Sequence, residues 1–211
     1  MDDEGFDLVS LLCSRLCHDL VSPVGAVNNG LEVLSDESDA EMREMAMRLI
    51  TQSAERAANK LEFARLAYGA AGGPDAVIDL TQARKVTAAL LKDHQVNLDW
   101  QCNAESAHRL PAKLLVNGAL LAAEALPRGG NVSAFLSQQE KRVKIRITAE
   151  GSMLRPLESM AEILEGEIAL AGLAPRLVQA YFTGMIARFM NGKLLAEIGP
   201  ERIILHGNFA G

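Results

Sequence analysis

Residues 13–30 read CSRLCHDLVSPVGAVNNG, and they define the character of the N-terminal part of the chain. Apolar residues recur through and beyond this stretch at steps of three and four, the spacing of one face of a bundle helix. They are Leu16, Leu20, Val24, Val27, Leu31 and Leu34. His18 lies midway between Leu16 and Leu20, about 200° around the helix from each. We therefore expect a long amphipathic helix that holds His18 rigidly and displays it to water.

His18 begins a short motif, because Asp19 follows it directly and Pro23 stands at the fifth following position. This motif resembles the phosphoacceptor box of two-component sensor kinases. More closely, residues 18–34 resemble the histidine phosphotransferases of the ChpT type found in alphaproteobacteria. The resemblance implies that His18 accepts a phosphoryl group and that Asp19 supports it. The alternative is a histidine that is merely solvated on a helix face, so the rest of the chain has to distinguish the two.

Length, composition and charge limit the kinds of protein that this chain can be. The chain has 211 residues, enough for one large or two small domains, and 49% of them are hydrophobic. A net charge of −6 disfavours nucleic acid and anionic membrane surfaces as partners. The most apolar stretch, residues 110–126, is interrupted by polar residues and a proline, so it is not a membrane span. The acidic residues 1–7 are unlike a signal peptide, and we expect a cytoplasmic protein.

Three cysteines, an odd and small number, fit a reducing compartment rather than a disulfide framework. Cys13 and Cys17 are four residues apart and could in principle bind a metal together with His18. No convincing fourth ligand and no second CxxC or HxxxH element accompany them. We expect both cysteines to be small packing residues in the bundle, and we expect the chain itself to bind no metal and no cofactor.

The first half of the chain predicts a helical hairpin. One helix spans residues 6–34, and Ser38 with Glu41 three positions later forms a capping box for a second helix that extends to Tyr68. Glycines and Pro74 then end the hairpin.

These signals divide the chain into two predicted domains. Residues 1–70 form the dimerisation and phosphotransfer hairpin, and residues 75–211 form a second domain.

A two-helix hairpin cannot enclose a core by itself, because each helix presents its apolar stripe to only one neighbour. In the second helix the stripe includes Met42, Met45, Leu49, Ser53, Arg56, Lys60 and Ala64, thickened by Ala46, Ile50, Ala57 and Leu61. Two hairpins packed face to face complete a four-helix bundle. We therefore predict a homodimer that displays one His18 per protomer on its outer surface.

The second domain alternates between strand and helix patterns. The predicted strands are 77–80, 96–101, 131–136, 142–149, 193–198 and 202–206, and the predicted helices are 81–92 (capped by Thr81), 111–126 and 177–190. This order resembles the ATP-binding domain that follows the histidine hairpin in sensor kinases. The resemblance implies a kinase-type (GHKL/Bergerat-like) α/β sandwich behind the hairpin.

The nucleotide motifs of that domain are degenerate. Asn117 with Gly129 and Gly130 lines up with the asparagine box, but the second asparagine of the box is replaced by Leu121. Leucine cannot supply the amide oxygen that would be a hard oxygen ligand for the Mg²⁺ of a nucleotide.

The later nucleotide motifs are lost as well. Ala149 stands where the resemblance implies an aspartate that reads adenine, and Met153 replaces a loop glycine, although Gly151 survives. Residues 174–176 read Ala-Pro-Arg in place of a glycine-rich phosphate loop, and Gly184 inside the next helix is a poor substitute. We therefore expect no ATP binding.

A kinase-like scaffold without an ATP site is expected to receive phosphate from another protein. The resemblance implies a histidine phosphotransferase that relays a phosphoryl group from the receiver aspartate of a hybrid histidine kinase to His18, and on to a response regulator aspartate. His18 would attack through Nε2, with Mg²⁺ supplied by the partner receiver. The alternatives are an ATP-dependent histidine kinase and a non-catalytic scaffold that binds receivers.

The predicted receiver-binding surface surrounds His18. We expect Pro23 to kink the helix by removing an amide donor, and Gly25 and Ala26 to leave a shallow docking surface. The full predicted set is Ser22, Pro23, Gly25, Ala26, Asn28, Asn29, Glu32 and Arg155. Polar residues of this kind are also commonly just solvated. Among the cations of the second helix, Arg48, Arg56 and Lys60, one can approach the phosphoryl group if it lies level with His18.

Overall fold

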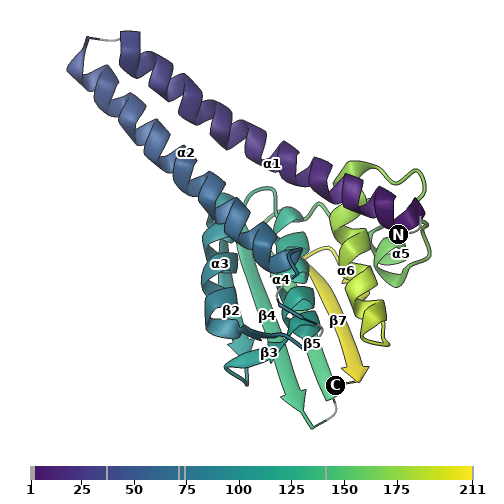
Figure 1. The fold of residues 1–211 in the computed structure, drawn as a ribbon. Helices are drawn as coiled ribbons and strands as arrows, with labels where there is room; N and C mark the ends of the chain where they lie inside the picture. Colours follow the sequence, from purple (N-terminus) through teal and green to yellow (C-terminus); the bar gives the residue numbers. More distant parts are fainter. Residues whose placement is uncertain (1–2, 37, 71, 74, 141, 211) are drawn as a thin grey trace.

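The structure is a computed structural model that describes residues 3–36, 38–70, 72–73, 75–140 and 142–210. Two long helices, α1 (Asp3–Asp36) and α2 (Ala40–Ala67), form an antiparallel hairpin that extends away from an α/β unit (Figure 1). The predicted fold of a helical hairpin followed by an α/β sandwich is confirmed. Pro74, which we predicted to close the hairpin, lies outside the described residues.

Aspartates, rather than the predicted hydroxyl residues, cap two of the helices. Asp39 Oδ1 accepts hydrogen bonds from the backbone amides of Glu41 (2.9 Å) and Met42 (3.0 Å), so the cap is one residue beyond the predicted Ser38. Asp79 likewise replaces the predicted Thr81 as the cap of α3 (Leu80–Asp93). An ionised carboxylate makes stronger hydrogen bonds to these unpaired amides than a hydroxyl does.

The line of contact between α1 and α2 departs from the predicted seam at two of its six positions, since Leu16, Leu20, Val27 and Leu34 are half-buried as expected. Pro23 and Gly30 are the buried residues of α1, whereas Val24 and Leu31, which directly follow them, remain exposed. A Cβ atom on Gly30 would lie 2.6 Å from Cγ1 of Ile50, so the glycine allows the two helices to approach closely. Val24 and Leu31 are consequently left exposed beside the contact.

The α/β unit contains a five-stranded sheet with the strand order β2-β4-β5-β7-β6. Its strands are β2 (Val96–Cys102), β4 (Gly130–Gln139), β5 (Arg142–Glu150), β6 (Leu195–Ile198) and β7 (Arg202–Ala210). β2 and β4 are parallel, and the other neighbours are antiparallel. The predicted strand at 77–80, β1 (Val77–Asp79), pairs in a separate two-stranded sheet with β3 (Ser106–His108), a strand that the sequence analysis did not predict.

Helices cover one face of this sheet (Figure 1). They are α3, α4 (Arg109–Glu124) and α6 (Val178–Phe189), accompanied by the short α5 (Met160–Glu165) and a 3₁₀ turn at Pro175–Leu177. Strand β5 alternates as a two-layer sandwich requires, because Val143 and Ile145 are buried while Lys144 and Arg146 are exposed. Within the described residues, none of the helices is both long and apolar enough to span a membrane.

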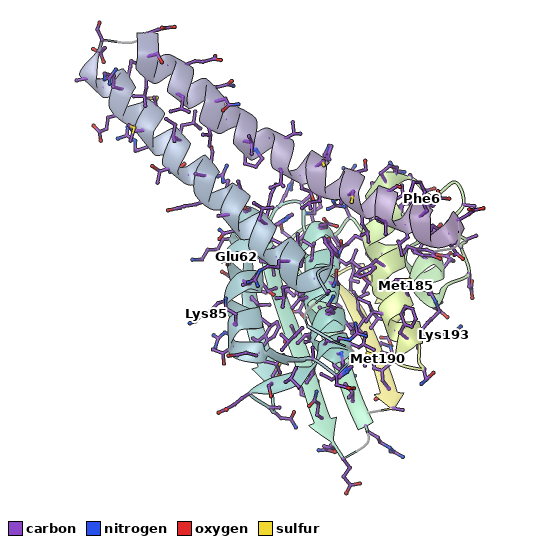
Figure 2. The ribbon with its side chains drawn as sticks, in the orientation of Figure 1. Phe6, Glu62, Lys85, Met185, Met190 and Lys193 are labelled. Carbon is purple, nitrogen blue, oxygen red and sulfur yellow. The ribbon has the colours of Figure 1, made fainter. Side chains whose placement is uncertain are left out.

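The hairpin is anchored on the α/β unit along the N-terminal half of α1 and the C-terminal half of α2. Figure 2 shows Phe6 and Glu62 on the parts of the two helices that lie over this unit, whereas the distal halves of both helices extend into open space. Tyr181 of α6 donates a 2.8 Å hydrogen bond to Glu4 of α1, and Phe63 and Ala67 of α2 join the main hydrophobic core. Helix α4, buried along almost its whole length, lies beneath this junction.

Candidate functional site

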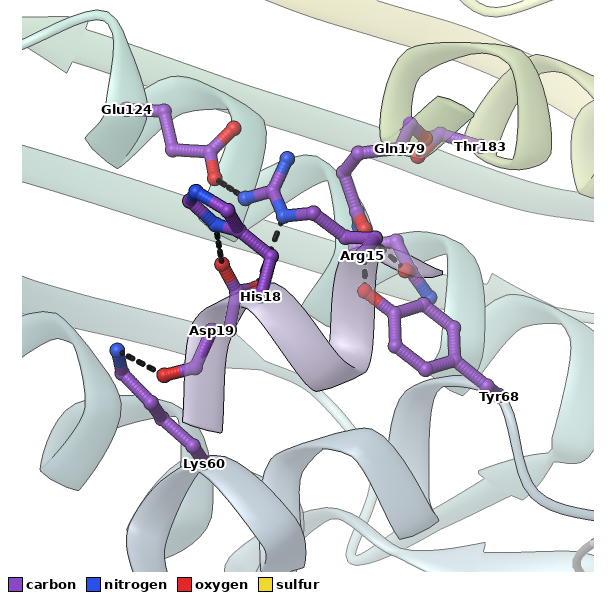
Figure 3. A network of polar contacts seen from close by, with 9 residues as sticks. Arg15, His18, Asp19, Lys60, Tyr68, Glu124, Gln179 and Thr183 are labelled. Atoms are coloured by element: carbon purple, nitrogen blue, oxygen red, sulfur yellow. Dashed lines mark hydrogen bonds and ion pairs between the residues drawn. The ribbon is translucent and has the colours of Figure 1, made fainter. Parts of the chain in front are cut away.

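His18 projects from α1 into solvent close to the junction of the hairpin and the α/β unit (Figure 3). Its side chain is 88% exposed, in agreement with the helical spacing. Its Nδ1 atom lies 3.5 Å from Oδ1 of Asp19. Asp19 therefore faces Nδ1, and Nε2 is the ring nitrogen on the far side of the imidazole from it.

Asp19 is held by a second contact on its other oxygen. Arg15, one helical turn earlier, approaches Oδ2 of Asp19 with its Nε atom at 2.8 Å. The Nη2 atom of Arg15 forms a further ion pair with Glu124 at the end of α4. The side chains of Arg15 and Glu124 are each only 17% exposed. The environment of His18 is therefore built from both parts of the protein.

The pKa of the Arg15 guanidinium reflects this enclosure. Burial alone would lower the pKa, but the charges of Glu124 and Asp19, with their hydrogen bonds, more than offset the burial and raise it. Arg15 thus remains a fixed positive charge between two carboxyl groups.

Pro23 acts on this site in a way that we did not predict. A proline lacks the amide that would donate to the carbonyl four residues earlier, which is the carbonyl of Asp19. Nζ of Lys60, on α2, donates to this carbonyl at 2.9 Å. Lys60 is thus the α2 cation that lies level with the motif, whereas Arg48 pairs with Glu44.

The predicted receiver-binding residues differ in their exposure. Ser22, Asn28, Asn29, Glu32 and Arg155 are exposed, and Gly25 and Ala26 are half-buried. Pro23 is buried, so its side chain is not displayed on the surface to which we assigned it.

Four of these residues form one stripe with the acceptor. His18, Ser22, Gly25, Asn29 and Glu32 follow one another at steps of four and three along α1. The backbone amide of Arg155 donates to the carbonyl of Ala125 at 2.8 Å, which brings Arg155 to the same end of α4 as Glu124.

Asn117, the remnant of the asparagine box, links three helices inside the protein. Its Nδ2 atom donates to the carbonyl of Lys113 at 2.7 Å, and its Oδ1 accepts from Nε2 of Gln179 at 2.7 Å. Gln179 Oε1 in turn accepts a hydrogen bond from the hydroxyl of Tyr68 at the end of α2 (Figure 3). Burial raises the pKa of Tyr68, so this hydroxyl keeps its proton well into the alkaline range.

The glycines that align with nucleotide loops serve close packing. A Cβ atom on Gly184 would lie 2.3 Å from the carbonyl oxygen of Leu164, and one on Gly151 would lie 2.7 Å from Cδ2 of Leu126. Leu121, at the second asparagine position, is fully buried. Of the surviving motif residues, Asn117 and Gly184 are thus buried, and Gly151 is half-buried.

The cysteines are not packed within the single chain as small core residues. Cys13 and Cys17 are exposed on α1, and their packing in a bundle of two hairpins stays a prediction. Cys102 is half-buried, and burial raises its pKa to about 11. Among the residues that the structure describes, no cluster of three or more His, Cys, Asp or Glu side chains is arranged to hold a metal ion.

Comparisons with known proteins agree with this architecture. Residues 80–202 match the family model described as the histidine phosphotransferase C-terminal domain. The protein phosphotransferase ChpT of Brucella abortus (strain 2308) is 36% identical over 198 residues, which cover 94% of this chain and 93% of that protein.

One solved structure gives the same assignment, and a second shares the fold. A bacterial phosphotransferase solved at 1.7 Å is 33% identical and superposes with a TM-score of 0.86, with 98% of each chain covered. The histidine kinase ThkA, solved in complex with the response regulator TrrA, is 13% identical with a TM-score of 0.50 over 98% of this chain and 63% of that one. At this low identity the second match shows a shared fold alone.

Proposed function

Because the chain belongs to the ChpT-type histidine phosphotransferases of two-component phosphorelays, we propose that His18 is its phosphoryl acceptor. The donor is the phosphorylated aspartate in the receiver domain of a hybrid histidine kinase, and the final acceptor is the receiver aspartate of a response regulator. The observation that carries this proposal is an almost fully exposed imidazole on a rigid helix, with Asp19 beside Nδ1.

The geometry suits attack through Nε2. A neutral imidazole with its proton on Nδ1 has its lone pair on Nε2, which faces solvent and therefore an approaching receiver. As Nε2 bonds to phosphorus, positive charge develops on the ring, and the Asp19 carboxylate stabilises it. Mg²⁺ held by the receiver neutralises the phosphoryl oxygens, so no metal site on this chain enters the scheme.

We further infer that the chain does not take phosphate from ATP. This inference is supported by Asn117, whose amide is fully engaged inside the protein, and by the buried Leu121 at the second asparagine position. Gly151 and Gly184 lie against neighbouring backbone atoms and so are not free to line a phosphate loop.

The exposed apolar flank of the hairpin supports homodimerisation. Gly30 and Ala46 lie at the contact between the two helices, and Leu31 and Met47 are the next residues along each chain. Because the helices are antiparallel, one step forward along each leads to the same flank of the hairpin. Leu31 and Met47 are both 51% exposed, and Val24 and Leu61 extend the same patch. A second copy of the hairpin would cover it as a four-helix bundle.

The opposite flank supports receiver docking. Ser22 and Asn29 directly precede the buried Pro23 and Gly30, and Met45 directly precedes the buried Ala46. One step backward along each antiparallel helix also leads to a common side, so Ser22, Asn29 and Met45 lie on the other flank of the hairpin. The stripe from His18 to Glu32 lies on this flank. Dimerisation and receiver docking therefore use separate surfaces.

Transfer of radiolabelled phosphate tests the proposed donor. Purified wild-type protein is incubated either with labelled ATP and Mg²⁺ or with a labelled receiver domain, and then with a second receiver. We expect label to enter only from the receiver and to leave to the second receiver. Label taken directly from ATP would make the protein a kinase, and receiver binding without any label transfer would make it a scaffold.

A further inference from the structure

The α/β unit contributes a side chain to the surroundings of the acceptor. Nδ1 of His18 contacts Oδ1 of Asp19, Oδ2 of Asp19 contacts Nε of Arg15, and Nη2 of Arg15 contacts Glu124 (Figure 3). We propose that Arg15 and Glu124 are positioning residues that fix Asp19, so that His18 keeps its proton on Nδ1 and its lone pair on Nε2. This inference rests on the proposed role of His18 as acceptor.

The two oxygens of Asp19 have different partners, and this fixes the orientation of its carboxylate. One oxygen is occupied by Arg15 at 2.8 Å, and the other faces His18 at 3.5 Å. Asp19 is 34% exposed, so without an anchor its carboxylate could rotate freely into water. Arg15 supplies the anchor, because its planar guanidinium presents Nε and Nη2 in a rigid geometry.

Glu124 makes the anchor rigid. A pair at positions i and i+4 on a solvated helix holds one geometry only weakly, because each side chain keeps its rotamer freedom. The Arg15 guanidinium instead contacts two carboxylates, those of Asp19 and Glu124. The side chains of Arg15 and Glu124 are also largely buried. They border a cavity of about 100 Å³ that Asp19, Lys60 and Tyr68 also line. Rotation of Arg15 away from Asp19 would break the ion pair with Glu124.

The position of Glu124 on its own helix supports a role beyond stability. Glu124 is the last residue of α4, where the partial negative charge of the helix C-terminus disfavours a carboxylate. Arg15 offsets this unfavourable placement. Lys60, which lines the same cavity, balances the second carboxylate, so the charge that acts on the imidazole most directly is the Asp19 carboxylate 3.5 Å from Nδ1.

The transfer step does not require His18 to lose its Nδ1 proton. The Nε2 lone pair bonds to phosphorus as the bond between phosphorus and the receiver carboxylate oxygen breaks, and that electron pair stays on the receiver carboxylate. The Nδ1 proton remains on the ring and faces Asp19. The reverse transfer uses the same arrangement, because the protonated ring is then the leaving group.

Two readouts test the proposal in the full-length protein. The ¹⁵N chemical shifts of the His18 ring report the tautomer without any phosphotransfer, and single-turnover transfer from a phosphorylated receiver reports the rate. The variants are Arg15→Met and Glu124→Gln, with Arg15→Lys as the conservative change. Arg48→Met and Glu44→Gln are the matched controls, because they remove an i, i+4 ion pair of 2.5 Å on α2 that does not contact the motif.

We expect Arg15→Met to raise the Nε2-protonated fraction of His18 and to slow transfer roughly 10- to 100-fold, with a smaller change of the same sign in Glu124→Gln. Arg15→Lys should restore only part of the rate, since an ammonium cannot bridge two carboxylates with fixed geometry. Both controls should behave as wild type. If Arg15→Met does not fold, the Glu124→Gln variant tests the proposal, because glutamine has nearly the same shape as glutamate.

The outcomes separate this inference from the proposed function. Wild-type rates and an unchanged tautomer in Glu124→Gln and Arg15→Met would overturn the positioning role while His18 still carried phosphate. If wild-type protein carried no phosphate at all, the proposed function would fail, and the tautomer measurement would still show whether Arg15 and Glu124 orient the ring.

Discussion

Lys60 donates a 2.9 Å hydrogen bond to the backbone carbonyl of Asp19, the carbonyl that Pro23 deprives of its helical donor. A cation on α2 thereby replaces a backbone amide of α1, in the residue next to His18. The proline of the motif thus leaves a backbone carbonyl without its helical donor, and a side chain of the second helix supplies the missing hydrogen bond. Helix α1 continues without interruption from Asp3 to Asp36.

A double-mutant cycle tests whether Lys60 replaces the backbone amide donor that Pro23 lacks. Lys60→Met should lower the free energy of unfolding by about 1–3 kcal/mol, because a partly buried carbonyl loses its charged partner. In a Pro23→Ala background the same change should cost clearly less, since the amide of the new alanine can donate to Asp19. Denaturant unfolding of the four proteins measures the coupling, and strictly additive effects would contradict it.

Tyr68→Phe should lower stability by about 1–3 kcal/mol at neutral pH, because it leaves Oε1 of the buried Gln179 without a donor. The pH dependence has a defined sign. Burial raises the pKa of Tyr68 above the usual value of 10.0, so its stabilising contribution is complete below pH 10 and is lost as the pH rises above it.

Unfolding of wild type and Tyr68→Phe at several alkaline pH values checks this sign. The stability difference between them should shrink above pH 10 by up to about 1.4 kcal/mol per pH unit. A difference that grows with pH would show that Tyr68 ionises more readily in the folded protein than in the unfolded chain.

Gly184→Ala should lower stability by about 1–3 kcal/mol, because its Cβ would overlap the backbone carbonyl of Leu164. Gly25→Ala is the matched control, because a Cβ there meets none of the described atoms within 4 Å and should gain about 0.5–1 kcal/mol of helix stability. Thermal unfolding compares the two. A tolerated alanine at position 184 would argue against a packing role for that glycine.

Met47→Glu should weaken the proposed dimer at least about 100-fold, because each interface would then bury uncompensated carboxylates. Met45→Glu is an unusually close control, since both methionines are 51% exposed and only two residues apart on α2. Sedimentation should find a monomer for the first variant and a dimer for the second. Equal behaviour of the two variants would show that the dimer, if formed, uses another surface.

The sequence predicted most of the fold because its signals are local. Helical periodicity predicted α1 and α2, and alternation predicted β2, β4 and β5. β3, with three residues, is too short to show a pattern and exists only through pairing with β1. The seam of α1 was wrong at two positions, Val24 and Leu31, because the buried residues beside them, Pro23 and Gly30, are not large apolar residues.

The site was only partly predictable, because one of its contacts joins residues far apart in the sequence. His18 and Asp19 form a contiguous motif, and Arg15, one turn before Asp19, could have been found from i, i+4 charge pairing. Glu124 is 109 residues from Arg15 in the chain, and only the packing of α4 beneath the hairpin brings them together. No local pattern marks such a contact.

The position of the phosphoryl group is the most direct test of the account. The protein is phosphorylated by a receiver domain, and phosphorus–proton NMR correlation then identifies the atom that bears the group, with His18→Gln as the control. We predict a single phosphoryl group on Nε2 of His18 and none in the variant. A group on Nδ1, on another residue, or retained in His18→Gln would contradict the account.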